Sequence, residues 1–129
     1  MCFGLIALLH LGEAASASEA IRPKNVVFFF TQRTGLPVYE VLYQRIRETI
    51  QGDVPGPVNF YTEYLDLERF PDEPYHRRLF DVYREKYAQK NIALLIRVGQ
   101  GPEKLLRQYG DGVFNNIPTL FLEYRNPLS

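Results

Sequence analysis

NVVFFFTQ, residues 25–32, is the stretch that decides the fold class of this 129-residue chain. Five apolar residues stand in a row within it, with no polar residue between them. A run of this kind is typical of a strand that is covered on both faces, as in a parallel sheet between two layers of helices. The stretch therefore predicts a central strand of an α/β domain.

Helix and strand patterns alternate regularly after this first strand. The sequence predicts helices at 37–52, 72–89 and 101–110 and strands at 58–66, 92–99 and 117–124. The stretch 58–66 alternates polar and apolar residues, which indicates an edge strand, whereas 92–99 is continuously apolar and fits the centre. Right-handed crossovers then predict a doubly wound parallel sheet in the order 2-1-3-4, a single flavodoxin-like lobe over residues 25–129.

Residues at helical spacing predict which helix faces meet the core. In the first helix, the expected buried stripe consists of Val38, Val41, Leu42, Ile46 and Ile50. In the second helix, it consists of tyrosines and a leucine four residues apart: Tyr75, Leu79, Tyr83 and Tyr87. His76 falls beside this second stripe, and we expect it on the exposed face of the helix.

The composition narrows the class of protein. Apolar residues make up 46% of the chain and charged residues 23%, as in ordinary globular proteins, and the length suits one domain. The 15 basic residues balance 15 acidic residues, and no basic stripe is present that could follow a phosphate backbone. We therefore expect no nucleic-acid partner.

The N-terminus predicts export from the cytoplasm. MCFGLIALLHLG is an apolar run too short for a spanning helix, and Ala15–Ser16–Ala17 follows it with the small residues of a cleavage site. We therefore predict a signal peptide at 1–17, a linker at 18–24 and a periplasmic mature chain; a buried N-terminal helix is the alternative. The single cysteine, Cys2, lies in this segment, so the mature chain would have no disulfide and no thiolate nucleophile.

Polar side chains at the carboxyl ends of the predicted strands are the candidates for ligand contact. In doubly wound sheets, ligands bind outside these ends, where the strand order reverses between the first and third strands. The loops concerned are 31–37, 66–70 and 99–102. Their side chains best suited to hydrogen-bond or pair with a ligand are Thr31, Gln32, Arg33, Asp66 and Gln100.

The sequence supports a catalytic, metal or phosphate site less well than it supports a site for a small polar ligand. Glu63 and Asp66 differ in parity along their strand, so they point to opposite faces and do not form a close carboxylate pair. TQRTGLP, residues 31–37, precedes a helix as an anion-binding loop does, but it lacks a hydroxyl after the glycine. We expect binding without catalysis, metal or cofactor; the alternative is a flavin- or nucleotide-binding enzyme or carrier on the same fold.

Several segments resemble one known family, the ABC-transporter substrate-binding-protein-like family, in its N-terminal lobe. They are FFFTQRTGLPVYE at 28–40, EYLD at 63–66, RFPDEPY at 69–75, KYA at 86–88 and IPTLF at 117–121. This family has a periplasmic-binding-protein-like type I fold and occurs in solute-binding proteins and in extracytoplasmic sensor regions of bacterial histidine kinases. The resemblance implies a small polar ligand, and a membrane transporter or a sensor kinase as the partner.

The likeness covers one lobe only, about residues 25–122. Members of the family close two lobes on their ligand, so the resemblance implies that the second lobe is absent from this chain. The face that a second lobe would cover is a candidate surface for a homodimer. A truncated interaction module that binds no ligand is the other alternative.

Overall fold

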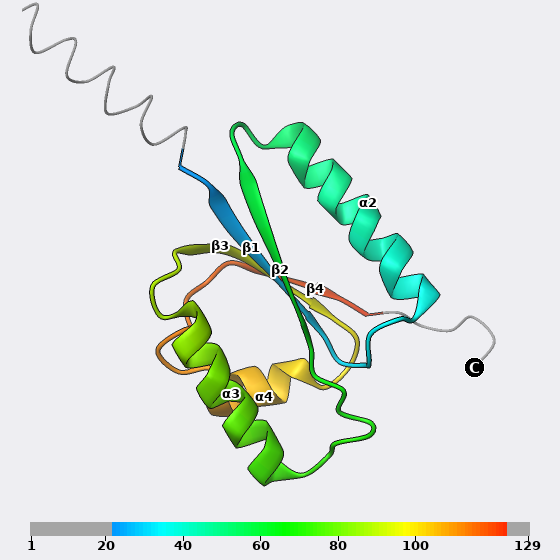
Figure 1. Cartoon of the computed structure of the whole chain (residues 1–129), viewed down its shortest axis with the longest axis vertical. Coiled ribbons are helices and arrows are strands. Elements are labelled where there is room, and N and C mark those ends of the chain that lie inside the picture. Colours follow the sequence, from blue (N-terminus) through cyan, green and yellow to red (C-terminus); the bar gives the residue numbers. More distant parts are fainter. Residues whose placement is uncertain (1–21, 124–129) are drawn as a thin grey trace, which may run out of the picture.

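Strands and helices alternate along residues 22–123, the part of the chain that this computed structural model describes (Figure 1). The elements are β1 (Lys24–Phe30), α2 (Pro37–Asp53), β2 (Val58–Tyr64), α3 (Glu73–Tyr87), β3 (Ile92–Val98), α4 (Pro102–Tyr109) and β4 (Thr119–Leu122). Every predicted element is present, with ends that differ by at most two residues. The predicted signal peptide and most of the predicted linker lie outside the described residues. None of these three helices is long and apolar enough to cross a membrane.

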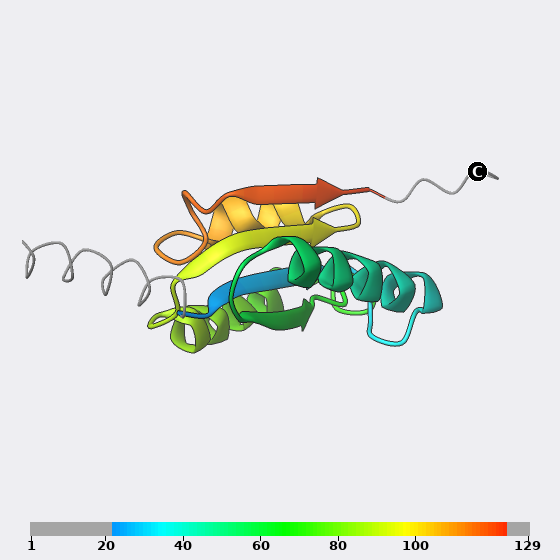
Figure 2. The same ribbon diagram turned by 90° about the horizontal axis from the view of Figure 1, so that it is seen from above.

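The four strands form one parallel sheet in the order β2-β1-β3-β4, which confirms the predicted flavodoxin-like layout. Figure 2 shows the strands side by side in this order. β1 lies inside the sheet because both of its faces are apolar, and its residues 26–30 are at most 3% exposed. The alternating strand β2 is at one edge, as predicted, and the short strand β4 is at the other.

Helices cover both faces of the sheet, with α2 on one side and α3 and α4 on the other (Figure 1). Successive side chains of a strand alternate between faces, so Phe28 and Phe30 point toward α2 and Phe29 points toward α3. The ring of Phe28 meets Tyr43 edge-on at 5.0 Å, and that of Phe29 stacks on Phe80 at 6.3 Å. Aromatic pairs of this kind add about 0.5–1.5 kcal/mol beyond the burial of their surface.

The predicted core stripe of α2 is only partly correct. Val38 and Val41 are 44% and 63% exposed, whereas Tyr39 is buried. Leu42 and Ile46 are partly buried against the sheet, as expected. The face that packs on the sheet begins at Tyr39, whose ring covers Phe30, and continues through Tyr43, so the two valines lie outside it.

The predicted exposure of His76 is wrong. Its side chain is 8% exposed, and Nε2 lies 2.8 Å from the backbone carbonyl oxygen of Phe70. The hydrogen bond satisfies a ring nitrogen that burial would otherwise leave without a partner. His76 is therefore a structural residue that fixes the loop leading into α3. The stripe of tyrosines and leucine is confirmed at Tyr83 and Tyr87, which are buried.

Candidate ligand-binding site

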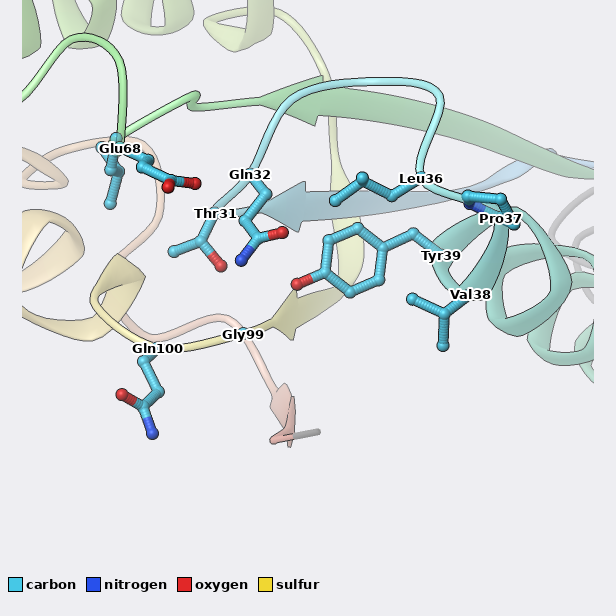
Figure 3. Close-up of a pocket in the computed structure, with 10 residues that line it drawn as sticks. Thr31, Gln32, Leu36, Pro37, Val38, Tyr39, Glu68, Gly99 and Gln100 are labelled. Carbon is cyan, nitrogen blue, oxygen red and sulfur yellow. The ribbon is translucent and has the colours of Figure 1, made fainter. Parts of the chain in front are cut away.

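A hollow of about 660 Å³ opens at the carboxyl ends of β1 and β3 (Figure 3). β1 continues into α2 on one face of the sheet, and β3 continues into α4 on the other, so their loops diverge and leave a crevice. The side chains that line it are mixed in character. The apolar ones are Leu36, Pro37, Val38 and Leu67; the polar ones are Thr31, Gln32, Tyr39, Glu68 and Gln100; Gly99 completes the lining.

Thr31 joins the ends of the two central strands beneath this hollow. Its side chain is 5% exposed, and Oγ1 donates a hydrogen bond of 2.9 Å to the carbonyl oxygen of Val98. Its backbone N–H donates to the same oxygen at 3.1 Å, and its own carbonyl accepts from Leu67 N–H at 3.0 Å. The hydroxyl proton is therefore already engaged, and a ligand would meet only the lone pairs of Oγ1.

Gly99 is the point of closest approach in the lining. Its φ of +94° lies in the left-handed region, where residues with a side chain are strained. A Cβ at this position would lie 1.9 Å from Thr31 Oγ1 and 3.3 Å from Tyr39 Oη. The absence of a side chain therefore lets the end of β3 pass against both hydroxyl groups.

Tyr39 is a lining residue that the candidate set from the sequence does not include. Its ring is 6% exposed and packs at 5.3 Å from the ring of Phe30, while its hydroxyl points toward Gly99 and Gln32 (Figure 3). The only signal in the sequence is an aromatic residue just inside the start of α2, after Pro37. Helical spacing alone does not separate it from the apolar residues beside it.

The two glutamines of the predicted set both line the hollow, in different ways. Gln32 is exposed, and its amide points toward the hydroxyl end of Tyr39 (Figure 3). Gln100 turns away from Thr31 and Gln32 (Figure 3), and its Nε2 donates to Glu123 Oε1 at 2.6 Å. Gln32 is thus the amide better directed at a ligand, whereas Gln100 connects the loop after β3 to the end of β4.

Arg33 and Asp66, the other two predicted contacts, do not line the hollow. Asp66 has a φ of 51°, and its carboxylate accepts hydrogen bonds from Arg69 Nε at 2.8 and 3.0 Å. The hydrogen bond from Arg69 lowers the pKa of Asp66, and the charges of Arg69 and Arg33 lower it further. Asp66 therefore stabilises its own turn, which presents Leu67 and Glu68 to the hollow in its place.

The lining favours hydrogen bonding over ion pairing. Glu68 is the single charged residue among the described residues that line the hollow. Hydroxyl and amide groups stand beside apolar surface, a combination that orients and buries a small polar molecule. Between residues 22 and 123, no three His, Cys, Asp or Glu side chains are grouped so that they could hold a metal ion.

No protein-family model, curated protein or solved structure matches this chain. The architecture is that of an α/β domain whose parallel sheet has the order 2-1-3-4.

Proposed function

We propose that this chain is a non-catalytic domain that binds a small polar molecule outside the cytoplasm, as part of a solute-uptake or signal-sensing system. The observation that supports this most directly is the hollow of about 660 Å³ at the reversal point of the sheet. Pockets that hold small molecules commonly have volumes of about 300–1,000 Å³. The strand ends of doubly wound sheets are their usual location.

In this proposal, affinity and orientation come from different parts of the lining. Leu36, Val38 and Leu67 offer apolar surface that a ligand can remove from water. The amide of Gln32 and the hydroxyl of Tyr39 hydrogen-bond the polar group of the ligand. The paired strand ends beneath them are held by backbone and side-chain hydrogen bonds, so little conformational entropy is lost when the ligand binds.

The proposed cellular context rests on the sequence. The apolar N-terminal run and its small-residue cleavage motif support export to the periplasm. The segments that resemble the ABC-transporter substrate-binding-protein-like family support a role beside a membrane transporter or a sensor kinase.

The test is a thermal-shift screen of the purified full chain against amino acids, sugars, polyols, nucleotides and flavins, with titration calorimetry on each compound that stabilises it. The proposal expects at least one small polar molecule to raise the melting temperature. Gln32→Leu and Tyr39→Phe should each weaken its binding by about tenfold, the value of one lost hydrogen bond. Gln51→Leu, an exposed glutamine at the other end of α2, should leave the affinity unchanged.

Two outcomes would contradict this proposal. If no compound stabilises the chain, binding by this domain alone is refuted and the interaction-module alternative gains support. If a flavin or nucleotide binds and the purified chain carries the matching absorption spectrum, the flavodoxin-like enzyme or carrier becomes the better description.

A further inference from the structure

Arg97 occupies an unusual position in the centre of the fold. It lies on the inner strand β3, on the face that packs toward α4, and its neighbours in register are Phe29 on β1 and Phe121 on β4. Its Nε atom is buried, and no group among residues 22–123 accepts a hydrogen bond from it. No ion pair to Arg97 is formed within the same part of the chain. The residue as a whole is partly exposed, so the unsatisfied group is this one buried donor. A buried donor without a partner is costly and is rare in folded proteins.

A second hollow, of about 440 Å³, lies beside this arginine between α4, β4 and the loop before β4. It shares no lining residue with the hollow at the strand ends. Arg97 and Arg107 both line it, and Glu103 is the single acid among the described residues of the lining. Two guanidinium groups against one carboxylate leave this hollow with a net positive charge.

The charges of the second hollow are only weakly neutralised within the chain. Arg107 is 75% exposed, and its NH1 atom lies 3.7 Å from Glu103 Oε1, a long contact between two solvated groups. Surface pairs of this kind contribute about 0–1 kcal/mol and are readily replaced. Glu103 therefore does not compete strongly with another anion for the two arginines.

Neutral donors complete the surroundings of Arg97. Asn115 and Asn116 line the hollow on the loop that precedes β4, and Thr119 lines it at the start of that strand. The amide of Asn115 donates to Asp111, and the hydroxyl of Thr119 donates to the carbonyl of Ile117. Asn116 is exposed in this lining, so its side-chain amide can meet a ligand.

We infer that this second hollow binds a small oxyanion, the carboxylate or phosphate group of a metabolite, with Arg97 as the central contact. Guanidinium groups hold such oxyanions through two parallel N–H···O bonds in the plane of the group. Phe121 lies against Arg97, with 5.5 Å from Cζ to the ring centroid. A ring over the guanidinium covers one of its faces, and because Nε is buried, the edge left for the anion is the one formed by the two Nη groups. This site is separate from the one proposed above and does not depend on it.

The test follows the arginine Nε–H resonances of the ¹⁵N-labelled full chain while inorganic phosphate or succinate is added at constant ionic strength. We expect the Arg97 resonance to shift saturably with one of these anions, and the resonance of Arg45, 81% exposed on α2, to stay in place. Saturation by phosphate or by succinate tells which oxyanion chemistry the hollow prefers. Arg97→Gln should weaken the binding at least tenfold, whereas the matched control Arg45→Gln should leave it unchanged.

Arg97→Lys is a second variant that tests the inference even where Arg97→Gln does not fold. It keeps the positive charge but cannot form the two parallel N–H···O bonds of a guanidinium group. It should retain the native circular dichroism spectrum and bind at least threefold more weakly than the unmodified chain. The inference is overturned if neither anion gives a saturable shift of Arg97. It is equally overturned if all exposed arginines shift together, or if both Arg97 variants bind as tightly as the unmodified chain.

Discussion

At the scale of single residues, the structure of the strand ends depends on a glycine. Gly99 has a positive φ and sits against Thr31 and Tyr39, so both its conformation and its lack of a side chain are required. Gly35 also has a positive φ, of 84°, but no atom lies within 4 Å of where its Cβ would be. The two glycines therefore separate the cost of backbone conformation from the cost of crowding.

Gly99→Ala should lower the free energy of unfolding by about 2–4 kcal/mol, because strain at a positive φ adds to the collision with Thr31 Oγ1. Gly35→Ala should lower it by about 1 kcal/mol, since only the backbone term applies. Urea unfolding of the two variants gives the comparison. Equal losses of unfolding free energy in the two variants would show that Thr31 moves aside at no cost in stability.

A second residue-scale prediction concerns Asp66 and Arg69. Because the hydrogen bond from Arg69 lowers the pKa of Asp66, the folded state holds this carboxylate ionised at pH values where the unfolded chain begins to protonate it. The contribution of the Asp66–Arg69 pair to the stability of the folded state is thus complete at neutral pH. It is lost as the pH falls from the ordinary aspartate value of about 3.9 through the lowered pKa.

The pKa of Asp66, followed by NMR titration of its side-chain carboxyl carbon, should rise toward the ordinary value in Arg69→Ala. Arg45→Ala, which removes an exposed arginine 3.9 Å from Glu48, should leave the pKa of Asp66 unchanged. An unshifted Asp66 pKa in Arg69→Ala would refute the pairing of these two residues.

At the scale of elements, α3 packs on the sheet through a mainly aromatic buried face. Its buried face runs along His76, Phe80, Tyr83 and Tyr87. Phe80 is fully buried and packs against the rings of Phe29 and Phe114. A cavity at Phe80 would therefore open in the middle of the aromatic layer between helix and sheet.

Phe80→Ala should reduce the free energy of unfolding by about 3–5 kcal/mol, the usual loss for a large ring in a core. Val82→Ala, two residues along the same helix at a side chain 57% exposed, should change it by less than about 0.5 kcal/mol. Chemical denaturation measures both. A loss below about 2 kcal/mol at Phe80 would mean that the neighbouring rings close the cavity.

A buried polar contact also ties α3 to the edge strand β2. The hydroxyl of Tyr87 and the ammonium group of Lys86 both donate to Glu63, a buried carboxylate. Burial raises the pKa of Tyr87, and the hydrogen bond to Glu63 and the charge of Glu63 raise it further. The alternation of polar and apolar residues in β2 predicts that one face of this strand is more exposed to solvent. It does not show that Glu63 is buried beneath α3.

The stability of the chain should therefore fall in alkaline solution. The neutral form of Tyr87 is favoured in the folded state, so its contribution is complete below the ordinary tyrosine pKa of about 10 and is lost as the pH rises above it. Ultraviolet titration should show Tyr87 ionising only together with unfolding. Tyr87→Phe should reduce the alkaline loss of stability relative to neutral pH, and an unchanged pH profile would contradict this role.

At the scale of the whole molecule, the central and edge strands should differ in how often they open. β1 has hydrogen-bonded neighbours on both sides and a covered surface on both faces, whereas β4 pairs on one side only within residues 22–123. Leu120 and Phe121 of β4 are 45% and 41% exposed. Local opening of a strand is easiest where few contacts must break.

Amide hydrogen exchange should therefore be slowest in β1 and β3 and at least tenfold faster in β4, after correction for intrinsic rates. Mass spectrometry of peptides that cover the four strands gives the comparison. Protection of β4 equal to that of β1 would mean that its free edge and exposed side chains are covered in solution.

The pattern of apolar and polar residues along the sequence was sufficient to predict the order of the elements and the topology of the sheet. Continuous apolar runs distinguished β1 and β3 from the alternating β2, and right-handed crossovers left one arrangement of the strands. The same reasoning located the loops at the strand ends, where Thr31, Gln32 and Gln100 of the candidate set line the hollow. These features depend on periodicity and chain direction, which a sequence carries directly.

Residue roles that depend on contacts between distant segments could be found only in the folded chain. Tyr39 lines the hollow because its ring rests on Phe30, and Asp66 is held in its turn by Arg69. His76 and the Nε atom of Arg97 are buried by neighbours that no spacing rule connects to them. Sequence periodicity determines which elements form and in what order, whereas the side chains that meet between elements decide which polar groups are satisfied and which stay available to a ligand.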